Sequence, residues 1–225
     1  SNLNSSLENS AIWITGNKVS FAGKAAELPK LPRDLVEKDL GGKFVMPGMT
    51  ETHAHLSFAD ASPFAIGETL VEEATLTAVR NARLMLGSGF TSAVSFGSTY
   101  KIDVALREAI LQGTVIGPRL LAAGRDLGAT ASNVDSGGGL SQIADGPWAL
   151  RKAVREQRKI GVDVVKIFID GEAINKQNPP GELSFTDEEV LATVEEAHRR
   201  KMRVACHARS AAAVKQAVKA GVDFI

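Results

Sequence analysis

The sequence lacks the features that would indicate an extracellular, membrane-spanning or nucleic-acid-binding protein. A single cysteine among 225 residues, Cys206, excludes an internal disulfide and fits a reducing compartment, so we expect a cytoplasmic protein. Lys plus Arg and Asp plus Glu both number 26, so the basic excess that a nucleic-acid or anionic-membrane surface needs is missing. No apolar run approaches the roughly 18 residues of a membrane span, and the first residues contain no apolar signal-peptide core. We therefore expect no nucleic-acid partner and no membrane partner.

Histidine is also scarce, so the positions of the few histidines are informative. Two of the four histidines, His53 and His55, stand two residues apart on a strand predicted at 50–56. Side chains two apart on a strand point to the same side, so the two imidazoles project into one space and can bind one metal ion. The alternative is a chance pair on a half-exposed strand. A third histidine, His207, at the end of another predicted strand favours the metal site.

Residues 1–46 are predicted to form part of a small β-sandwich domain. Two short apolar runs, 11–15 and 18–22, flank Gly16-Asn17, which has the chemistry of a tight turn and predicts a β-hairpin. Two further strands are predicted at 35–40 and 43–46. The second domain is expected to begin at Pro47 and to comprise residues 47–225.

The second domain alternates between strands and helices. The predicted strands are 50–56, 90–96, 119–123, 162–170 and 203–208, with the start of a sixth at 223–225. The predicted helices are 70–86, 102–111, 148–160, 187–201 and 210–220. Such alternation indicates β-α-β units around a parallel sheet, either doubly wound or a (β/α)8 TIM-type barrel. A complete barrel takes roughly 250 residues, so we expect an incomplete barrel that stops partway round.

Lys166 is the strongest single anomaly, because it interrupts the almost wholly apolar strand predicted at 162–170. An isolated ammonium costs several kcal/mol to bury, so it must be paired, deprotonated or chemically altered. One alternative is a lysine that reaches outward along its stem or pairs with an acid such as Asp170. The histidines on other predicted strands favour a role in a metal site.

Residues 124–146 are rich in Gly, Ser and Asp and are predicted to be a flexible surface loop. They contain no phosphate-binding fingerprint, because the glycines are neither spaced G-x-G-x-x-G nor followed by Lys-Ser/Thr. In a barrel this loop follows the carboxyl end of a strand, where active sites lie.

Three ordered segments resemble the amidohydrolase superfamily of metal-dependent hydrolases: residues 46–55 after a small β unit, residues 164–168, and residues 205–208. Within it the chain is similar to the subgroup of imidazolonepropionase-like enzymes, Xaa-Pro dipeptidases, ochratoxin-type amidases, and phenylurea and thiocarbamate hydrolases. The resemblance implies a hydrolase that cleaves an amide-like C–N bond of an amide, dipeptide, urea or carbamate. We expect a small-molecule substrate and a homo-oligomer.

The resemblance also implies roles for individual residues. His53 and His55 would hold one divalent metal ion, His207 the second, and Lys166 would be carbamylated by carbon dioxide and bridge the two ions. The metals would be zinc, with cobalt or manganese as alternatives, and a hydroxide shared between them would attack the substrate. The catalytic general acid/base Asp and a further metal histidine are expected beyond Ile225. The competing functions are a mononuclear-metal deaminase of the same superfamily and a non-catalytic scaffold that retains the fold.

Some positions depart from the subgroup or remain without a role. The usual His-Gly pair after strand three and the Ala-Ser-Gly-Gly run after the lysine strand are missing, which leaves the substrate contacts unassigned. His198 is predicted to be a surface or packing residue of a helix, and Cys206 to face the helix layer. Four residues follow predicted strand ends and could meet substrate, namely Arg125, Asp126, Glu172 and Arg209.

Overall fold

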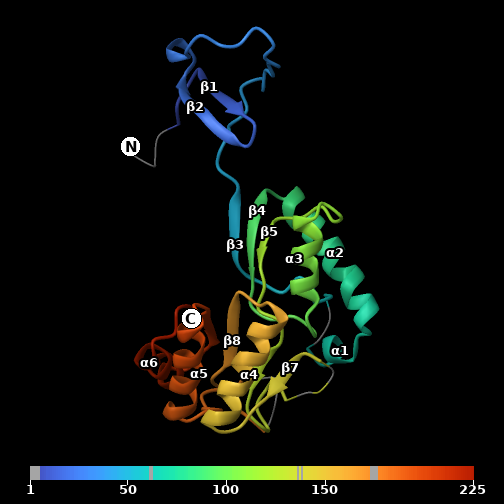
Figure 1. The fold of residues 1–225 in the computed structure, drawn as a ribbon, viewed down its shortest axis with the longest axis vertical. Coiled ribbons are helices and arrows are strands. Elements are labelled where there is room, and N and C mark those ends of the chain that lie inside the picture. The colour runs from blue at the N-terminus through green and yellow to red at the C-terminus, as the bar shows by residue number, and fades with distance from the viewer. Residues whose placement is uncertain (1–5, 61–62, 136, 138, 173–176) are drawn as a thin grey trace. The chain divides into compact units, whose positions relative to one another are not determined.

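The computed structural model (Figure 1) describes residues 6–60, 63–135, 137, 139–172 and 177–225. The chain divides into two compact units, Ser1–Met46 and Pro47–Ile225. Within the described ranges, no helix is both long enough and apolar enough to cross a membrane.

The first unit contains the predicted hairpin. β1 (Ser10–Thr15) pairs with β2 (Lys18–Lys24) in antiparallel fashion, and a short 3-10 turn, η1 (Ala25–Glu27), follows. Gly16 in the connecting turn has a φ of +60°, a backbone conformation that glycine adopts without strain. The hairpin prediction is confirmed.

The prediction of strands at 35–40 and 43–46 was wrong, because both segments are irregular. Their apolar residues are largely exposed, Val36 to 92% and Phe44 to 88%. A strand satisfies its backbone N–H and C=O groups through a neighbouring strand, and within residues 6–46 the only described sheet is β1 with β2. Apolar spacing alone therefore gave a wrong result. That this unit is part of a β-sandwich stays a prediction.

The second unit contains two groups of parallel strands. The first group is β3 (Met49–Ala54), β4 (Phe90–Ser95) and β5 (Arg119–Leu121). The second is β7 (Ser141–Ile143), β6 (Asp126–Gly128), β8 (Val164–Phe168) and β9 (Arg203–His207), in that spatial order.

The two groups join into one curved arrangement just after β5. The carbonyl of Ala122 accepts hydrogen bonds from the N–H groups of Asp163 (2.7 Å) and Val164 (3.2 Å) at the start of β8. At the far side, Ala205 of β9 forms a parallel bridge with Phe224. The main strands thus follow one another in chain order, β3, β4, β5, β8 and β9. A doubly wound sheet reverses its strand order, whereas a barrel does not, so the fold is a (β/α) barrel that is not closed in this chain.

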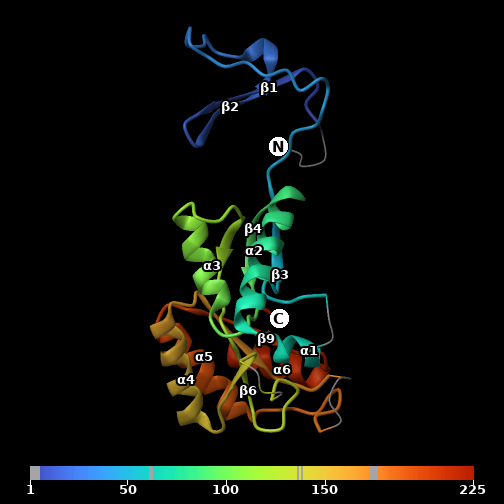
Figure 2. The ribbon, with the colours of Figure 1, turned by 90° about the vertical axis from the view of Figure 1, so that its right-hand side faces the viewer.

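Helices flank the strands, as the barrel prediction requires. The long ones are α2 (Val71–Gly87), α3 (Ile102–Leu111), α4 (Pro147–Ile160), α5 (Asp187–Arg199) and α6 (Ala211–Ala220), all within two residues of their predicted ends. Figure 1 shows α2 and α3 beside β4 and β5 and α4 beside β8, and Figure 2 shows α2 beside β4 from a second side; α5 packs against β9. A short helix, α1 (Pro63–Glu68), was not predicted, although proline at its first position is a recognised start signal.

The two faces of the strands are distinct, and this decides where the site lies. Val165, Ile167 and Cys206 pack in the cluster formed with the outer helices. Val164 and Ala205 belong to a separate cluster with Phe96. Because side chains alternate along a strand, this second cluster marks the inner face of the barrel. The prediction that Cys206 faces the helix layer is confirmed, and burial raises the pKa of its thiol to about 11.

Residues 124–146 are not the featureless surface loop predicted from their composition. They include β6 and β7, and Leu127 of β6 pairs with Ile167 of β8. Leu127, Val134 and Leu140 are buried, and Asp145 accepts hydrogen bonds from the N–H and hydroxyl of Thr130. The prediction failed because a few apolar side chains, spaced among many glycines, anchor the segment to the barrel. Residues 136 and 138 lie outside the described part.

Glu196 links α4 to α5 and provides a test of the fold. Its buried carboxylate accepts hydrogen bonds from Arg155 (2.9 Å) and Arg200 (2.8 Å), and these, the Arg155 bond above all, hold its pKa down at about 2. The folded pKa lies below the ordinary 4.5, so the stabilisation is present above about pH 4.5 and is lost as the pH falls toward 2.

We expect Glu196→Gln to destabilise the protein by roughly 1–3 kcal/mol at pH 7, because two guanidinium groups lose their anion. Thermal unfolding of both proteins between pH 2 and pH 7 measures this, and the difference should shrink toward pH 2. A pH-independent difference would contradict the assignment.

Candidate metal centre

The two predicted histidines of β3 point to the inner face. Ala54 between them packs in the cluster formed with the outer helices, so His53 and His55 face the opposite way. Their ring centroids are 5.2 Å apart. His53 is exposed and His55 is half-buried. The strand thus presents a pair of imidazoles at its carboxyl end.

The orientation of His55 is held by the backbone after β4. Its Nδ1 lies 3.1 Å from the carbonyl oxygen of Gly97, and a carbonyl can only accept, so Nδ1 carries the proton. This leaves Nε2 with its lone pair available to a metal ion. Phe58 stacks on the imidazole with the ring centroids 4.6 Å apart, which restricts its rotation.

Lys166 lies on the inner face with 2% of its surface exposed. It pairs in register with Ala205 of the inner cluster, and its Nζ is 5.2 Å from the centroid of the Phe96 ring. The His53 ring contacts the same Phe96 ring at 5.0 Å between centroids. Among the described residues Nζ makes no ion pair or hydrogen bond, and burial lowers the pKa of this lysine. The structure therefore brings Lys166 toward the histidines of β3.

Asp170, the predicted alternative partner of Lys166, is used elsewhere. Its carboxylate accepts hydrogen bonds from the N–H groups of Arg209 (3.0 Å) and Ser210 (2.7 Å), at the start of α6. The structure therefore contradicts the pairing of Lys166 with Asp170.

His207 ends β9 and faces the same inner side. It pairs in register with Phe168, and the two rings stack 3.9 Å apart. Its Nε2 is buried, forms no hydrogen bond with the described residues, and lies 3.1 Å from an oxygen of Glu172. Burial and then the charge of Lys166 lower the pKa of His207 to about 4, and the charge of His53 acts in the same direction.

The other imidazoles are also poised to be neutral. Burial lowers the pKa of His55 to about 4, and burial followed by the charge of Lys166 lowers that of His53. Neutral imidazoles are the form that binds metal ions. All three histidines therefore offer a nitrogen lone pair at neutral pH.

Asp126 is a buried acid that the sequence suggested only as one of four possible substrate contacts. It stands at the start of β6 with 4% of its surface exposed, and its Oδ1 makes no hydrogen bond with the described residues. Burial raises its pKa to about 7, and the nearby charge of Lys166 partly opposes this rise. The available signal was its position directly after a strand end. Burial could not be read from the sequence.

Two other candidate residues lie away from this cluster. His198 pairs with Asp223 at 2.9 Å on the outside of the barrel, which confirms its packing role. The guanidinium of Arg125 donates to the carbonyl of Ser141 in β7 at 3.4 Å.

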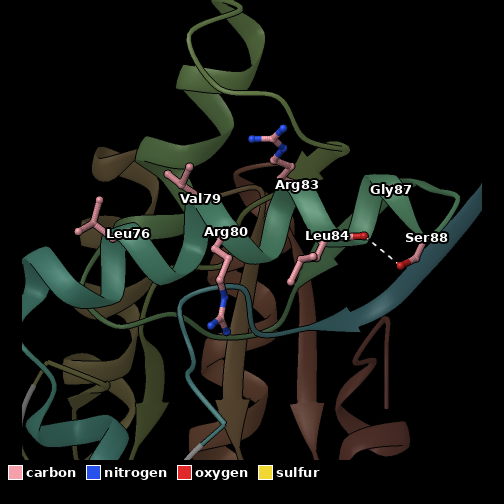
Figure 3. A pocket seen from close by; sticks show the side chains of 7 residues that line it. All are labelled: Leu76, Val79, Arg80, Arg83, Leu84, Gly87 and Ser88. Atoms are coloured by element: carbon pink, nitrogen blue, oxygen red, sulfur yellow. Dashed lines mark hydrogen bonds between the residues drawn. The ribbon is translucent and has the colours of Figure 1, made fainter.

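A surface hollow along α2 is also distinct from the cluster (Figure 3). It contains no histidine or carboxylate, and its lining comprises Leu76, Val79, Arg80, Arg83, Leu84, Gly87 and Ser88. Figure 3 shows these side chains along one helix, with the Ser88 hydroxyl donating to the carbonyl of Leu84. It supplies no metal ligands.

The donor chemistry fits divalent metal ions, provided that Lys166 takes part. No three His, Cys, Asp or Glu side chains in the described ranges form a group that could hold an ion without it. Within the described ranges, His207 Nε2 is a buried nitrogen without a hydrogen bond, and Lys166 is a buried amine without an ion pair. A carbamate on Lys166 would supply the anionic oxygens that complete such a group.

The fold and the cluster define a (β/α) barrel protein with a candidate metal centre at the carboxyl ends of its strands. The chain belongs to the Amidohydrolase family, whose sequence profile matches residues 44–225. The predicted family resemblance is confirmed.

Individual relatives support the same placement. Ochratoxinase from Aspergillus niger is 28% identical over 240 residues, covering 96% of this chain and 49% of the relative. Its crystal structure matches with a TM-score of 0.81 at 25% identity, over 97% of this chain and 56% of that one. Imidazolonepropionase from Paracoccus denitrificans is 28% identical over 201 residues, covering 85% of this chain and 44% of the relative.

A solved Xaa-Pro dipeptidase with methionine bound in its active site is also similar. It matches with a TM-score of 0.77 at 28% identity, over 95% of this chain and 55% of that one. The chain spans about half the length of each of these proteins.

Proposed function

We propose that the protein is a metal-dependent hydrolase that cleaves an amide-like C–N bond. The observation that carries the proposal is Lys166, a buried amine that forms no ion pair with the described residues and lies on the same inner face as His53, His55 and His207. Such an amine is destabilising unless it is chemically altered, and a carbamate converts the cation into an anion with two oxygen donors. Relatives named as an ochratoxinase, an imidazolonepropionase and a Xaa-Pro dipeptidase support a reaction at amide or related bonds.

In this proposal His53 and His55 would hold one divalent ion and His207 a second, and a carbamate on Lys166 would supply oxygen donors to both. Zinc is our first choice, and cobalt and manganese also suit histidine and carboxylate ligands. The ions would supply activation of a water molecule and polarisation of the scissile carbonyl group.

The chain's own residues prepare and shield this centre. Gly97 fixes the tautomer of His55, which leaves the Nε2 lone pair available to the proposed metal ion. Phe58 stacks on His55 and Phe168 on His207, and both rings exclude water from one side of a ligand. The general acid/base Asp that protonates the leaving amine is proposed to follow Ile225. The substrate is proposed to be a small molecule, and a homo-oligomer in the cytoplasm remains our prediction.

Metal content tests the proposal directly. We expect close to two divalent ions per chain by elemental analysis of the full-length protein. Cys206→Ser is a matched control, because this thiol faces the outer helices, and it should retain both ions. About one ion would favour a mononuclear deaminase, and none would favour a non-catalytic scaffold.

The substrate class is tested with a panel of N-acyl amino acids, Xaa-Pro dipeptides, aryl ureas and carbamates. Hydrolysis of at least one class that is lost on metal removal and restored by zinc, cobalt or manganese supports the proposal. Deamination without cleavage of any panel member would contradict it.

A further inference from the structure

Glu172 is a carboxylate beside the candidate metal centre that the family pattern does not account for. It stands four residues after Phe168, the end of β8, where the subgroup usually carries small residues. Its side chain is 12% exposed. The preceding residue, Gly171, donates its N–H to the carbonyl of Glu182 at 3.1 Å, so the backbone is held in place. The side chain therefore occupies a defined position over the strand end.

The contacts of Glu172 involve residues at the centre. One carboxylate oxygen lies 3.1 Å from Nε2 of His207 and 2.9 Å from a guanidinium nitrogen of Arg209. The His207 Nε2 forms no hydrogen bond within the described ranges, so this close approach lacks hydrogen-bond alignment. The negative charge of Glu172 also acts on Lys166 and raises the pKa of that amine, against the larger lowering by burial. The carboxylate thus contacts His207 and lies close enough to Lys166 for its charge to act on that amine.

We infer that Glu172 is an additional ligand of the metal ion that His207 and carbamylated Lys166 share. The inference rests on the proposed function. Two donor atoms that each lie about 2.1 Å from one zinc ion are about 3.0–3.4 Å apart, so the observed 3.1 Å suits a shared ion. Two ligands of one metal ion direct their lone pairs at the ion and not at each other. The His207 nitrogen is likewise not aligned with the neighbouring Glu172 oxygen.

Arg209 has a supporting position in this arrangement. Its side chain is 60% exposed and it contacts the same oxygen of Glu172 from the solvent side. A ligating carboxylate is commonly oriented by an outer hydrogen-bond partner, and Arg209 is such a positioning residue. The competing explanation is that Glu172 serves only to anchor Arg209.

The test is a cobalt(II) titration of the metal-free full-length protein, followed by calorimetry and by visible absorption. The wild type should bind two ions. In Glu172→Gln the affinity for the second ion should fall about 10- to 100-fold and its absorption band should shift, with the first ion bound within about twofold of wild type. Glu172→Asp, which keeps a carboxylate, should lie between them. Glu182→Gln, the same change at an exposed neighbouring position, should bind as wild type does.

The outcomes separate this inference from the proposed function. Two ions bound equally well by wild type and Glu172→Gln would overturn the ligand and leave the hydrolase proposal standing. If Arg209→Gln reproduces the full loss of affinity and the band shift, Glu172 acts only as an anchor for Arg209, and this result also overturns the inference. If the wild type binds no cobalt ion, both the inference and the proposed function are overturned. If metal-free Glu172→Gln unfolds at the same temperature as the wild type, misfolding is excluded as the cause of a loss of cobalt affinity. If Glu172→Gln is unstable, intermediate cobalt affinity of Glu172→Asp tests the inference instead.

Discussion

Lys166→Ala is expected to abolish binding of the second metal ion and to reduce hydrolysis by roughly three orders of magnitude or more. The physical reason is that alanine has no amine to carbamylate, so the inner face of β8 loses the carbamate oxygens. Small carboxylic acids such as acetate should restore part of the activity, because the truncated side chain leaves space in which a free carboxylate can take the place of the carbamate. Metal analysis, together with rate measurements across acetate concentrations, tests this.

Two variants control for packing and charge. Lys166→Met keeps the length of the side chain without an amine, so it should lose the metal but resist rescue by acetate, because the space stays filled. Metal-free Lys166→Met should also be at least as stable as the metal-free wild type, since the substitution removes a buried ammonium that forms no ion pair with the described residues. Lys152→Ala, at an exposed position of α4, should behave as wild type. Full activity of Lys166→Ala would remove the carbamate from the mechanism.

Gly97→Ala is expected to weaken metal binding at the His53 and His55 pair by about 10- to 100-fold. Gly97 has a φ of +133°, which an alanine adopts only with strain, and an added Cβ would lie 2.6 Å from Oδ1 of Asp126. Its carbonyl accepts the Nδ1–H of His55. A displaced backbone therefore frees the imidazole to rotate, and stability should fall by roughly 1–3 kcal/mol.

Cobalt titration and thermal unfolding measure the two effects of Gly97→Ala separately. Gly87→Ala is the matched control, because an added Cβ at this position in α2 meets no atom within 4 Å, so it should leave metal affinity unchanged and should not lower stability. The double variant Gly97→Ala with Asp126→Ala removes the clash but keeps the backbone strain, so it should recover only part of the stability. Metal affinity unchanged in Gly97→Ala would show that the Gly97 carbonyl does not position His55.

Local patterns in the sequence predicted the barrel elements and the four candidate ligands. The helices and the main strands follow from periods of 3.6 and 2 residues, which depend on neighbouring positions only. The same alternation correctly placed Cys206 on the face of its strand that lies opposite His207. It also predicted strands at 35–40 and 43–46 that do not form, because a strand depends on a partner that no local pattern supplies.

The sequence by itself therefore determined the main strands and the long helices of residues 47–225 and which polar residues interrupt them, but not α1, β6 or β7. Only the tertiary structure decided that the strands follow barrel order, through the Ala122 carbonyl at the start of β8, and that residues 124–146 are anchored rather than loose. It also decided the environments of Gly97, Asp126 and Glu172. These depend on contacts between residues far apart in the chain, and burial, which moves the pKa of Asp126 to about 7, exists only once those contacts have formed.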